Sequence, residues 1–213
     1  MSTQLSKQVL QHLIAKRVAK ELVGPYTVNL GIGIPTLVAE YLEDDQVYLH
    51  TENGLLGVMN IEEDRIDPNL VNAGKQPVGE AIGASFFNSA DSFAMIRGGH
   101  VDVAILGALQ VDESGIIANW AVPGKNIMGV GGAMDLLVGA KKVIVTMNHT
   151  SKDGQSKILK ECTYPITSTR SVDMLVTELA VFKVKQKQLK LMELMPGATI
   201  EEVREKTEAN FIE

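Results

Sequence analysis

Glu52 is the side chain in this sequence whose position best suits covalent chemistry. It directly follows a predicted strand at residues 46–51 and precedes Asn53-Gly54, a pair that favours a turn. The carboxylate would stand at the edge of a sheet on a stiff base, where Asn53, Gly54 and Gly57 would let backbone amides approach it closely. Such a carboxylate could act as a nucleophile. A solvated turn glutamate fits the same local pattern and is the commoner case.

Two glycine-rich segments could supply backbone N–H groups. Residues 31–35 read Gly-Ile-Gly-Ile-Pro, and Gly31 and Gly33 resemble the glycines of anion-binding turns at a helix N-terminus. The segment lacks the third glycine of a dinucleotide fingerprint and is not a P-loop, so a plain tight turn fits it equally well. Residues 129–132 read Gly-Val-Gly-Gly, and Gly131 and Gly132 could donate to a developing oxyanion. A flexible loop is an equally good interpretation of this second segment.

Other reactive side chains give weaker signals. Lys75 and Lys125 each lie beside a glycine and could reach a phosphate as point charges, although a solvated surface lysine is the commoner case. Cys162 has no histidine near it in sequence, and the chain has no Gly-x-Ser-x-Gly elbow. The four histidines lack the spacing of zinc ligands, so a structural role is expected for each; they are His12, His50, His100 and His149. We expect neither a metal nor a resident cofactor.

The hydrophobic pattern predicts strands that alternate with helices. A helix is expected over residues 5–22, closed by Gly24-Pro25. Further predicted helices cover residues 35–42, 172–179 and 201–206. Predicted strands cover residues 27–30, 46–51, 101–106, 143–147, 181–185 and 189–193. Residues 57–80 show few regular signals and are interpreted as a long surface excursion and a candidate lid.

This alternation predicts an α/β fold, an open and mainly parallel sheet with helices on both faces. No linker or composition break divides the chain, so one domain is expected over residues 1–213. Ligands in such sheets bind beyond the carboxyl ends of the strands. Glu52 and Gly31–Gly33 would both lie at that edge.

Composition excludes several classes of function. The net charge is −6 and no long basic run exists, so a nucleic-acid partner is not expected. A single cysteine suits a reducing compartment. The first residues lack a long apolar run and no stretch of about 20 apolar residues occurs, so neither a signal peptide nor a membrane span is expected. A cytoplasmic location follows as the simplest expectation.

Taken together, the segments resemble the B subunit of the family I CoA-transferases, which include succinyl-CoA:3-ketoacid CoA-transferase and the acetate or butyrate–acetoacetate enzymes. The resemblance covers almost the whole chain. The matching blocks are NLGIGIPT (29–36), ENGLLG (52–57), VNAGK (71–75), GASFFNSADSFAMIRGGHVD (83–102), LGALQVDE (106–113), ANWAVPGK (118–125) and GVGGAMDL (129–136).

The resemblance implies roles for particular residues. Glu52 would be the nucleophile that carries CoA as a thioester, Gly132 would supply an oxyanion-hole amide, and Asn29 would line the site. CoA would be a substrate, and a separate A subunit of similar fold would complete the site in a heterodimer or heterotetramer. Succinyl-CoA and acetoacetate are the first expected substrates, with acetate or butyrate and acetoacetate as the alternative.

The sequence departs from the family pattern around residues 58–82. Thr51 replaces the usual serine before the nucleophile, Met59-Asn60 replace a frequent Gly and Pro, and Ile82 replaces a frequent proline. These changes bear on the selectivity for the acyl group.

Two competing functions share this fold. An acyl-CoA hydrolase would use Glu52 but pass the acyl group to water. A ligand sensor, related to sugar-phosphate isomerases and effector-binding domains, would catalyse nothing, and the intact sequence blocks argue against it.

Overall fold

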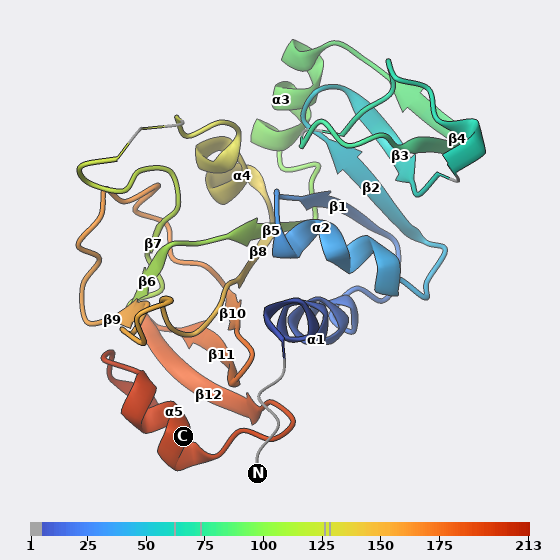
Figure 1. Ribbon diagram of the computed structural model, residues 1–213. Helices are drawn as coiled ribbons and strands as arrows, with labels where there is room; N and C mark the ends of the chain where they lie inside the picture. Colours follow the sequence, from blue (N-terminus) through green and yellow to red (C-terminus); the bar gives the residue numbers. More distant parts are fainter. Residues whose placement is uncertain (1–5, 62, 73, 126, 128) are drawn as a thin grey trace.

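One sheet extends through the chain, from its first strand to its last (Figure 1). The computed structural model describes residues 6–61, 63–72, 74–125, 127 and 129–213. The helices are α1 (Lys7–Ala19), α2 (Ile34–Leu37), α3 (Ser89–Arg97), α4 (Ala133–Gly139) and α5 (Ile200–Lys206), with 3₁₀ turns η1 (Val38–Tyr41) and η2 (Glu63–Arg65). The strands are β1 (Tyr26–Leu30), β2 (Val47–Thr51), β3 (Leu55–Met59), β4 (Gly79–Phe86), β5 (Val103–Gly107), β6 (Gln110–Asp112), β7 (Ile117–Ala118), β8 (Lys142–Thr146), β9 (Ile158–Leu159), β10 (Met174–Val176), β11 (Ala180–Lys185), β12 (Gln188–Leu194) and β13 (Phe211–Ile212).

The main sheet has ten strands in the order β13-β12-β11-β10-β8-β5-β1-β2-β3-β4. Its central strands, from β10 through β8, β5 and β1 to β2, are all parallel. Antiparallel hairpins extend the sheet on both sides, through β3 and β4 at one edge and β11 and β12 at the other. Strands β7, β6 and β9 form a separate three-stranded sheet.

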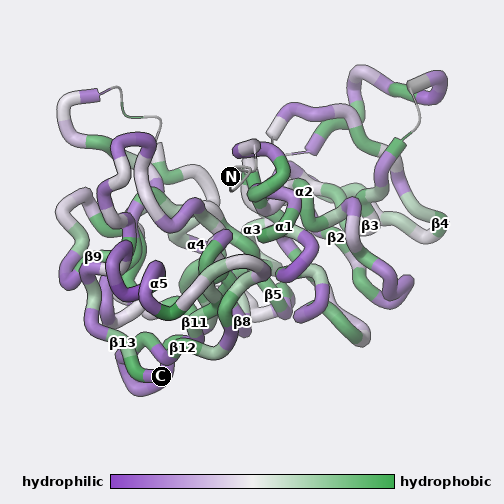
Figure 2. The backbone as a smooth tube through the Cα atoms, turned by 60° about the horizontal axis from the view of Figure 1, so that its bottom comes forward, coloured by the Kyte–Doolittle hydropathy of each residue, from purple (hydrophilic) through white to green (hydrophobic). Residues whose placement is uncertain are grey.

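Helices cover both faces of the main sheet, as the sequence predicted. One core cluster contains buried side chains of α1 and α2, such as Ile14, Val18 and Ile34, packed on inner residues of the central strands. The other contains Ile96 of α3, Leu136 and Leu137 of α4 and residues of α5. Figure 2 shows hydrophobic residues along β5 and β8, whereas α5 is mainly hydrophilic. Burial of both faces explains why β5 reads as a continuous apolar run.

The predicted helix at residues 172–179 is wrong. Residues 174–176 form β10, which lies between β8 and β11 and is fully buried. A turn follows, in which the Thr177 hydroxyl accepts hydrogen bonds from the N–H groups of Leu179 and Ala180 at 3.2 and 3.1 Å. The apolar spacing of this segment is compatible with a helix, but burial on two sides favours a strand.

Other boundaries also differ from the predictions. The helix expected at residues 35–42 is divided into α2 and η1. β3 and β4 occupy both ends of the segment expected to be irregular over residues 57–80, so the irregular excursion covers residues 60–78. Residue 5, where the first helix was expected to begin, lies outside the described residues; Ser6 caps this helix by accepting from the Val9 N–H at 3.4 Å.

Candidate active site

Glu52 lies directly beyond the carboxyl end of β2, at the edge where the parallel strands end. β1 and β2 pair in parallel with Asn29 opposite His50, so the Asn29 amide reaches across to the next strand. Asn29 Nδ2 donates to Glu52 Oε2 at 3.0 Å. Asn29 is fully buried and Glu52 is half-buried, so one carboxylate oxygen has a fixed partner in a partly desolvated place.

Gly132 lies against the Glu52 side chain. A Cβ atom at residue 132 would lie 3.2 Å from Glu52 Cγ and 3.3 Å from Glu52 Oε1. A side chain at residue 132 would therefore crowd Glu52, although the Gly132 backbone, with φ −79° and ψ −1°, is accessible to other residues. Gly131 differs, because its φ of +53° favours glycine on conformational grounds. The chain thus brings Asn29, Glu52 and Gly132 together although they are distant in sequence.

Gly31 and Gly33 form the loop after β1. The Gly31 N–H donates to Ile105 O at 2.8 Å, and a Cβ at residue 31 would lie 3.1 Å from that oxygen. Gly33 precedes α2 and has a φ of +96°. α2 has only four residues, so this loop is a tight turn and not the start of a long helix.

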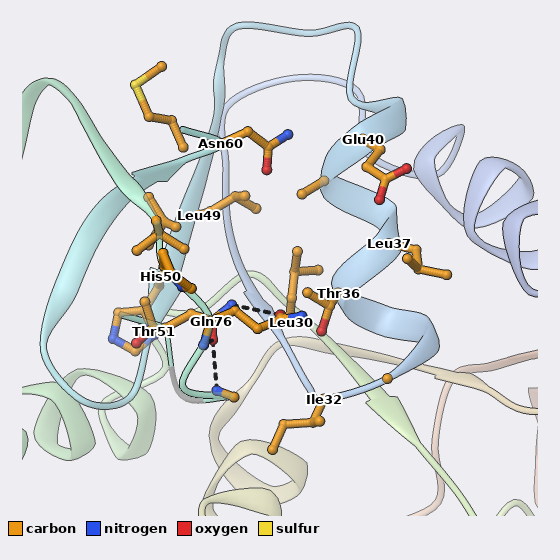
Figure 3. Close-up of a pocket in the computed structure, with 18 residues that line it drawn as sticks. Leu30, Ile32, Thr36, Leu37, Glu40, Leu49, His50, Thr51, Asn60 and Gln76 are labelled. Atoms are coloured by element: carbon orange, nitrogen blue, oxygen red, sulfur yellow. Dashed lines mark hydrogen bonds between the residues drawn. The ribbon is translucent and has the colours of Figure 1, made fainter. Parts of the chain in front are cut away.

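A cavity of about 450 Å³ lies beside this loop. Figure 3 shows Thr36 and Glu40 along one side, Leu49, His50 and Thr51 of β2 along the other, and Gln76 of the excursion. Its lining is mixed, with leucines from three elements and the amides of Asn60, Asn72 and Gln76. Thr51, which directly precedes Glu52 in the chain, lines this cavity, whereas Glu52, Asn29 and Gly132 are not among its lining residues.

Asn53 connects Glu52 to the excursion. Its Nδ2 donates to Val71 O at 2.8 Å, so the excursion is not remote from Glu52. Lys75 is exposed in the neighbouring turn, with a φ of +61°, between the cavity residues Gly74 and Gln76. Lys125 is exposed in a turn closed by its own N–H and Val122 O at 3.1 Å. Within the described residues no hydrogen bond or ion pair joins either lysine to Glu52.

His50 and Ser92 belong to the surroundings of Glu52 and were missed as functional candidates. His50 Nε2 lies 3.0 Å from Ser92 Oγ, and Nδ1 lies 3.2 Å from Asn29 Nδ2. Burial lowers the pKa of His50 to about 4, so the ring is neutral at neutral pH. The position of His50 two residues before Glu52, on the same face of a predicted strand, was the available signal.

The structure describes other reactive groups, among them Cys162 and side chains of the types that bind metal ions. Burial first, and then Asp112, raise the pKa of the Cys162 thiol to about 12, so this thiol is a poor nucleophile. The described residues contain no cluster of three or more His, Cys, Asp or Glu side chains suited to a metal ion. No helix in the described ranges is long and apolar enough to cross a membrane.

The fold and this site define an α/β protein with a carboxylate at the carboxyl edge of its sheet. The family model described as Coenzyme A transferase matches residues 12–206, and the chain belongs to this family.

Known relatives agree with this assignment. The B subunit of succinyl-CoA:3-ketoacid coenzyme A transferase from Helicobacter pylori is 52% identical, over 95% of this chain and 98% of its own length. The beta subunit of acetate CoA-transferase from Escherichia coli is 53% identical, over 93% of this chain and 91% of its own length. The crystal structure of an acyl-CoA transferase apoenzyme from Escherichia coli O157:H7 has a TM-score of 0.77 and 23% identity, covering 100% of this chain and 43% of that chain.

These matches confirm the family, the α/β fold and the CoA-transferase class of enzyme predicted from the sequence. Each of the two named relatives is named as one subunit of its enzyme. The roles of the individual site residues stay predictions.

Proposed function

We propose that this chain is the catalytic subunit of an enzyme that moves CoA between carboxylic acids through a glutamyl-CoA thioester on Glu52. The observation that carries the proposal is the half-buried Glu52 carboxylate, which is held by the buried Asn29 amide and lies against Gly132. A carboxylate suits this reaction because it serves as both nucleophile and leaving group. A carboxylate nucleophile attacks through an oxygen that carries no proton, so it needs no general base.

The reaction begins with attack of a Glu52 oxygen on the carbonyl carbon of an acyl-CoA. The C–S bond breaks, giving a mixed anhydride and CoA thiolate. The thiolate then attacks the Glu52 carbonyl carbon and releases the first acid as its carboxylate, leaving the glutamyl-CoA thioester. An incoming carboxylate runs the same steps in reverse, so the kinetics are ping-pong.

Asn29 and Gly132 have distinct roles in this scheme. The Asn29 N–H holds one Glu52 oxygen and leaves the other free to attack; a hydrogen bond to a charged group contributes about 1.5–3 kcal/mol. The Gly132 N–H stabilises the oxyanion of each tetrahedral stage, and such a donor typically contributes about 3–4 kcal/mol. The lack of a side chain at Gly132 leaves room for the acyl carbon beside Glu52.

The cavity beside the Gly31–Gly33 loop receives the substrate, and the excursion over residues 60–78 limits the access of water to the anhydride. We propose that Lys75, which is exposed between the cavity residues Gly74 and Gln76, pairs with the second carboxylate of a dicarboxylic acyl group such as succinyl. Succinyl-CoA with acetoacetate is the first substrate pair we propose. Acetate or butyrate with acetoacetate is the alternative, since relatives named for succinyl-CoA and for acetate are about equally similar to this chain.

We further propose that an A subunit binds the exposed carboxyl edge of the sheet and completes the site, as a heterodimer or heterotetramer. Support comes from the relatives, which are themselves named as subunits. CoA is then a substrate, and the reaction requires no resident cofactor.

The test is the intact mass of this chain after the complex with its A subunit is mixed with acyl-CoA and no acceptor acid. The wild-type chain should gain the mass of CoA less one water, and hydroxylamine should remove it. Glu52→Gln should not form the adduct promptly. Glu205→Gln, which changes an exposed glutamate of α5, is the matched control and should form it normally.

Absence of the wild-type adduct would contradict the proposal. Adding acceptor acid distinguishes the hydrolase alternative. A transferase consumes acyl-CoA continuously only when the acceptor is present, whereas a hydrolase does so without it.

A further inference from the structure

A buried line of polar side chains extends from Glu52 into α3. Asn29 Nδ2 lies 3.0 Å from Glu52 Oε2 and 3.2 Å from His50 Nδ1, and it also donates to His50 O at 3.3 Å. On the other side of the ring, His50 Nε2 lies 3.0 Å from Ser92 Oγ. Asn29 and Ser92 are fully buried and His50 is 3% exposed. The proposed reaction consumes neither His50 nor Ser92.

The Asn29 amide indicates the direction of the hydrogen bonds on the two sides of the His50 ring. An asparagine amide nitrogen can only donate, so His50 Nδ1, which faces it, must accept. The single proton of the neutral ring therefore lies on Nε2 and is donated to Ser92 Oγ. Ser92 Oγ in turn donates to Thr51 O at 3.5 Å, a long contact.

The plane of the His50 ring is fixed as well. Phe87 stacks on it with ring centroids 5.9 Å apart and an interplanar angle of 12°. His50 is paired with Asn29 in the β1–β2 register, so the backbone also sets the height of the ring relative to the amide. Three interactions therefore hold the His50 ring. Phe87 packs on its face, Ser92 contacts Nε2, and the pairing of β1 with β2 positions its backbone.

Of the two polar atoms of the Asn29 amide, the described contacts hold only Nδ2. Its Oδ1 is buried and has no hydrogen-bond partner among the described residues, so the contacts of Nδ2 determine which way the amide faces. If the amide rotated by half a turn, Oδ1 would face the Glu52 carboxylate and repel it.

We propose that His50, held by Ser92 and Phe87, is a positioning residue that orients the Asn29 amide and thereby the Glu52 carboxylate. His50 Nδ1 accepts from Asn29 only when Nδ2 faces Glu52, so it selects the productive orientation of the amide. This inference depends on the proposed role of Glu52, because it assigns a support to that nucleophile.

The test compares His50→Asn with His50→Leu in the complex with the A subunit. Both substitutions remove the ring and its stacking on Phe87, and the two new side chains are nearly the same size. The Oδ1 atom of the introduced asparagine would stand near the place of the histidine Nδ1 and could accept from Asn29, whereas a leucine could not. The measurements are the rate of CoA-adduct formation on this chain, the KM for acyl-CoA and the melting temperature.

We expect His50→Leu to slow adduct formation by roughly 10- to 100-fold, with the KM changed less than about threefold, because the nucleophile is misplaced and not the substrate. His50→Asn should restore the rate to within about fivefold of the wild type. The melting temperatures of the two variants should fall together.

The outcomes separate this inference from the proposed function. A wild-type complex without the adduct would overturn the reaction itself. A wild-type adduct that His50→Leu forms as fast as His50→Asn would leave the reaction intact and overturn the positioning role.

If the His50→Leu complex does not fold, Ser92→Ala provides a second test of the positioning role. Without the Ser92 hydroxyl as acceptor, the ring proton of His50 is free to move from Nε2 to Nδ1. The Nδ1–H group would then face the Asn29 Nδ2 group, and both groups would be donors. Adduct formation should slow by roughly 3- to 30-fold. A wild-type rate in a normally folded Ser92→Ala complex would overturn the proposal.

Discussion

At the scale of single residues, the site depends on two close contacts of the Glu52 side chain. Glu52 has the Asn29 amide on one oxygen and the Gly132 backbone beside the other. A strand end followed by Asn-Gly predicted the place of Glu52. The contact with Gly132, which lies 80 residues further along the chain, could be inferred only from the family resemblance, because nothing in the local sequence distinguishes a catalytic glycine loop from a flexible one.

Gly132→Ala should slow the reaction without unfolding the chain. The backbone at residue 132 accepts alanine, so we expect the free energy of unfolding to change by less than about 1 kcal/mol. The new methyl group would press on Glu52 Cγ and Oε1 and should slow adduct formation by about 10- to 100-fold. Adduct kinetics and urea unfolding measure both effects. Gly107→Ala is the control, because its methyl would meet only Ile32 O at 3.7 Å; equal rates in the two variants would contradict the prediction.

Two buried histidines should make the chain sensitive to mild acid. Burial lowers the pKa of His50 and of His149 to about 4, with Lys206 and Lys157 adding to the effect at His149. The unfolded chain takes up these protons near pH 6.5, whereas the folded chain does so only near pH 4. Stability is therefore lost as the pH falls from 6.5 to 4, by up to about 3 kcal/mol for each histidine.

Urea unfolding at a series of pH values measures this loss. His149→Gln should remove about half of the histidine contribution to the slope between pH 6.5 and 4. His100→Gln changes an exposed histidine and is the matched control. A slope that His149→Gln leaves unchanged would show that the ring does not titrate as inferred.

At the scale of elements, the position of α4 against α3 sets the geometry of the site. α3 carries Ser92 and α4 begins directly after Gly132. An ion pair of 2.7 Å joins Arg97 Nε of α3 to Asp135 Oδ1 of α4. The Arg170 guanidinium donates to the carbonyls of Leu137 and Ala140 at the other end of α4. The ion pair thus joins α3 to α4, and Arg170 holds the C-terminal end of α4.

Gly139→Ala should disturb this arrangement. A Cβ at residue 139 would lie 2.1 Å from Ile96 O, a backbone atom, so α4 would have to move away from α3. We expect a loss of more than about 2 kcal/mol in the free energy of unfolding, together with slower adduct formation. Calorimetry of Gly197→Ala provides the comparison, because Gly197 has a positive φ of +89° but no atom within 4 Å of its Cβ position. Similar melting temperatures for the two variants would contradict the prediction.

At the scale of the whole molecule, the sequence predicts the parallel centre of the sheet better than its edges. β1, β2, β5 and β8 were recognised because burial on two sides requires continuous or alternating apolar residues. β3 and β4 were missed because an edge hairpin with exposed residues, such as Ile82 and Phe86, carries no regular pattern. β10 was mistaken for a helix because its neighbours in the sheet, which decide the matter, are distant in sequence.

The hydrogen bond from Asn53 Nδ2 to Val71 O links the residue after Glu52 to the segment that carries the cavity residues Asn72, Gly74 and Gln76. A long acyl tail that fills this cavity should therefore accelerate turnover and not merely tighten binding, since it stiffens the segment on which Glu52 rests. In the wild-type complex kcat should rise with acyl length, and in Asn53→Ala only KM should respond. The same length dependence in both would show that the tail and the carboxylate act independently. If the length dependence differs between the two as expected, the unreactive end of the substrate controls how fast its reactive end is transferred.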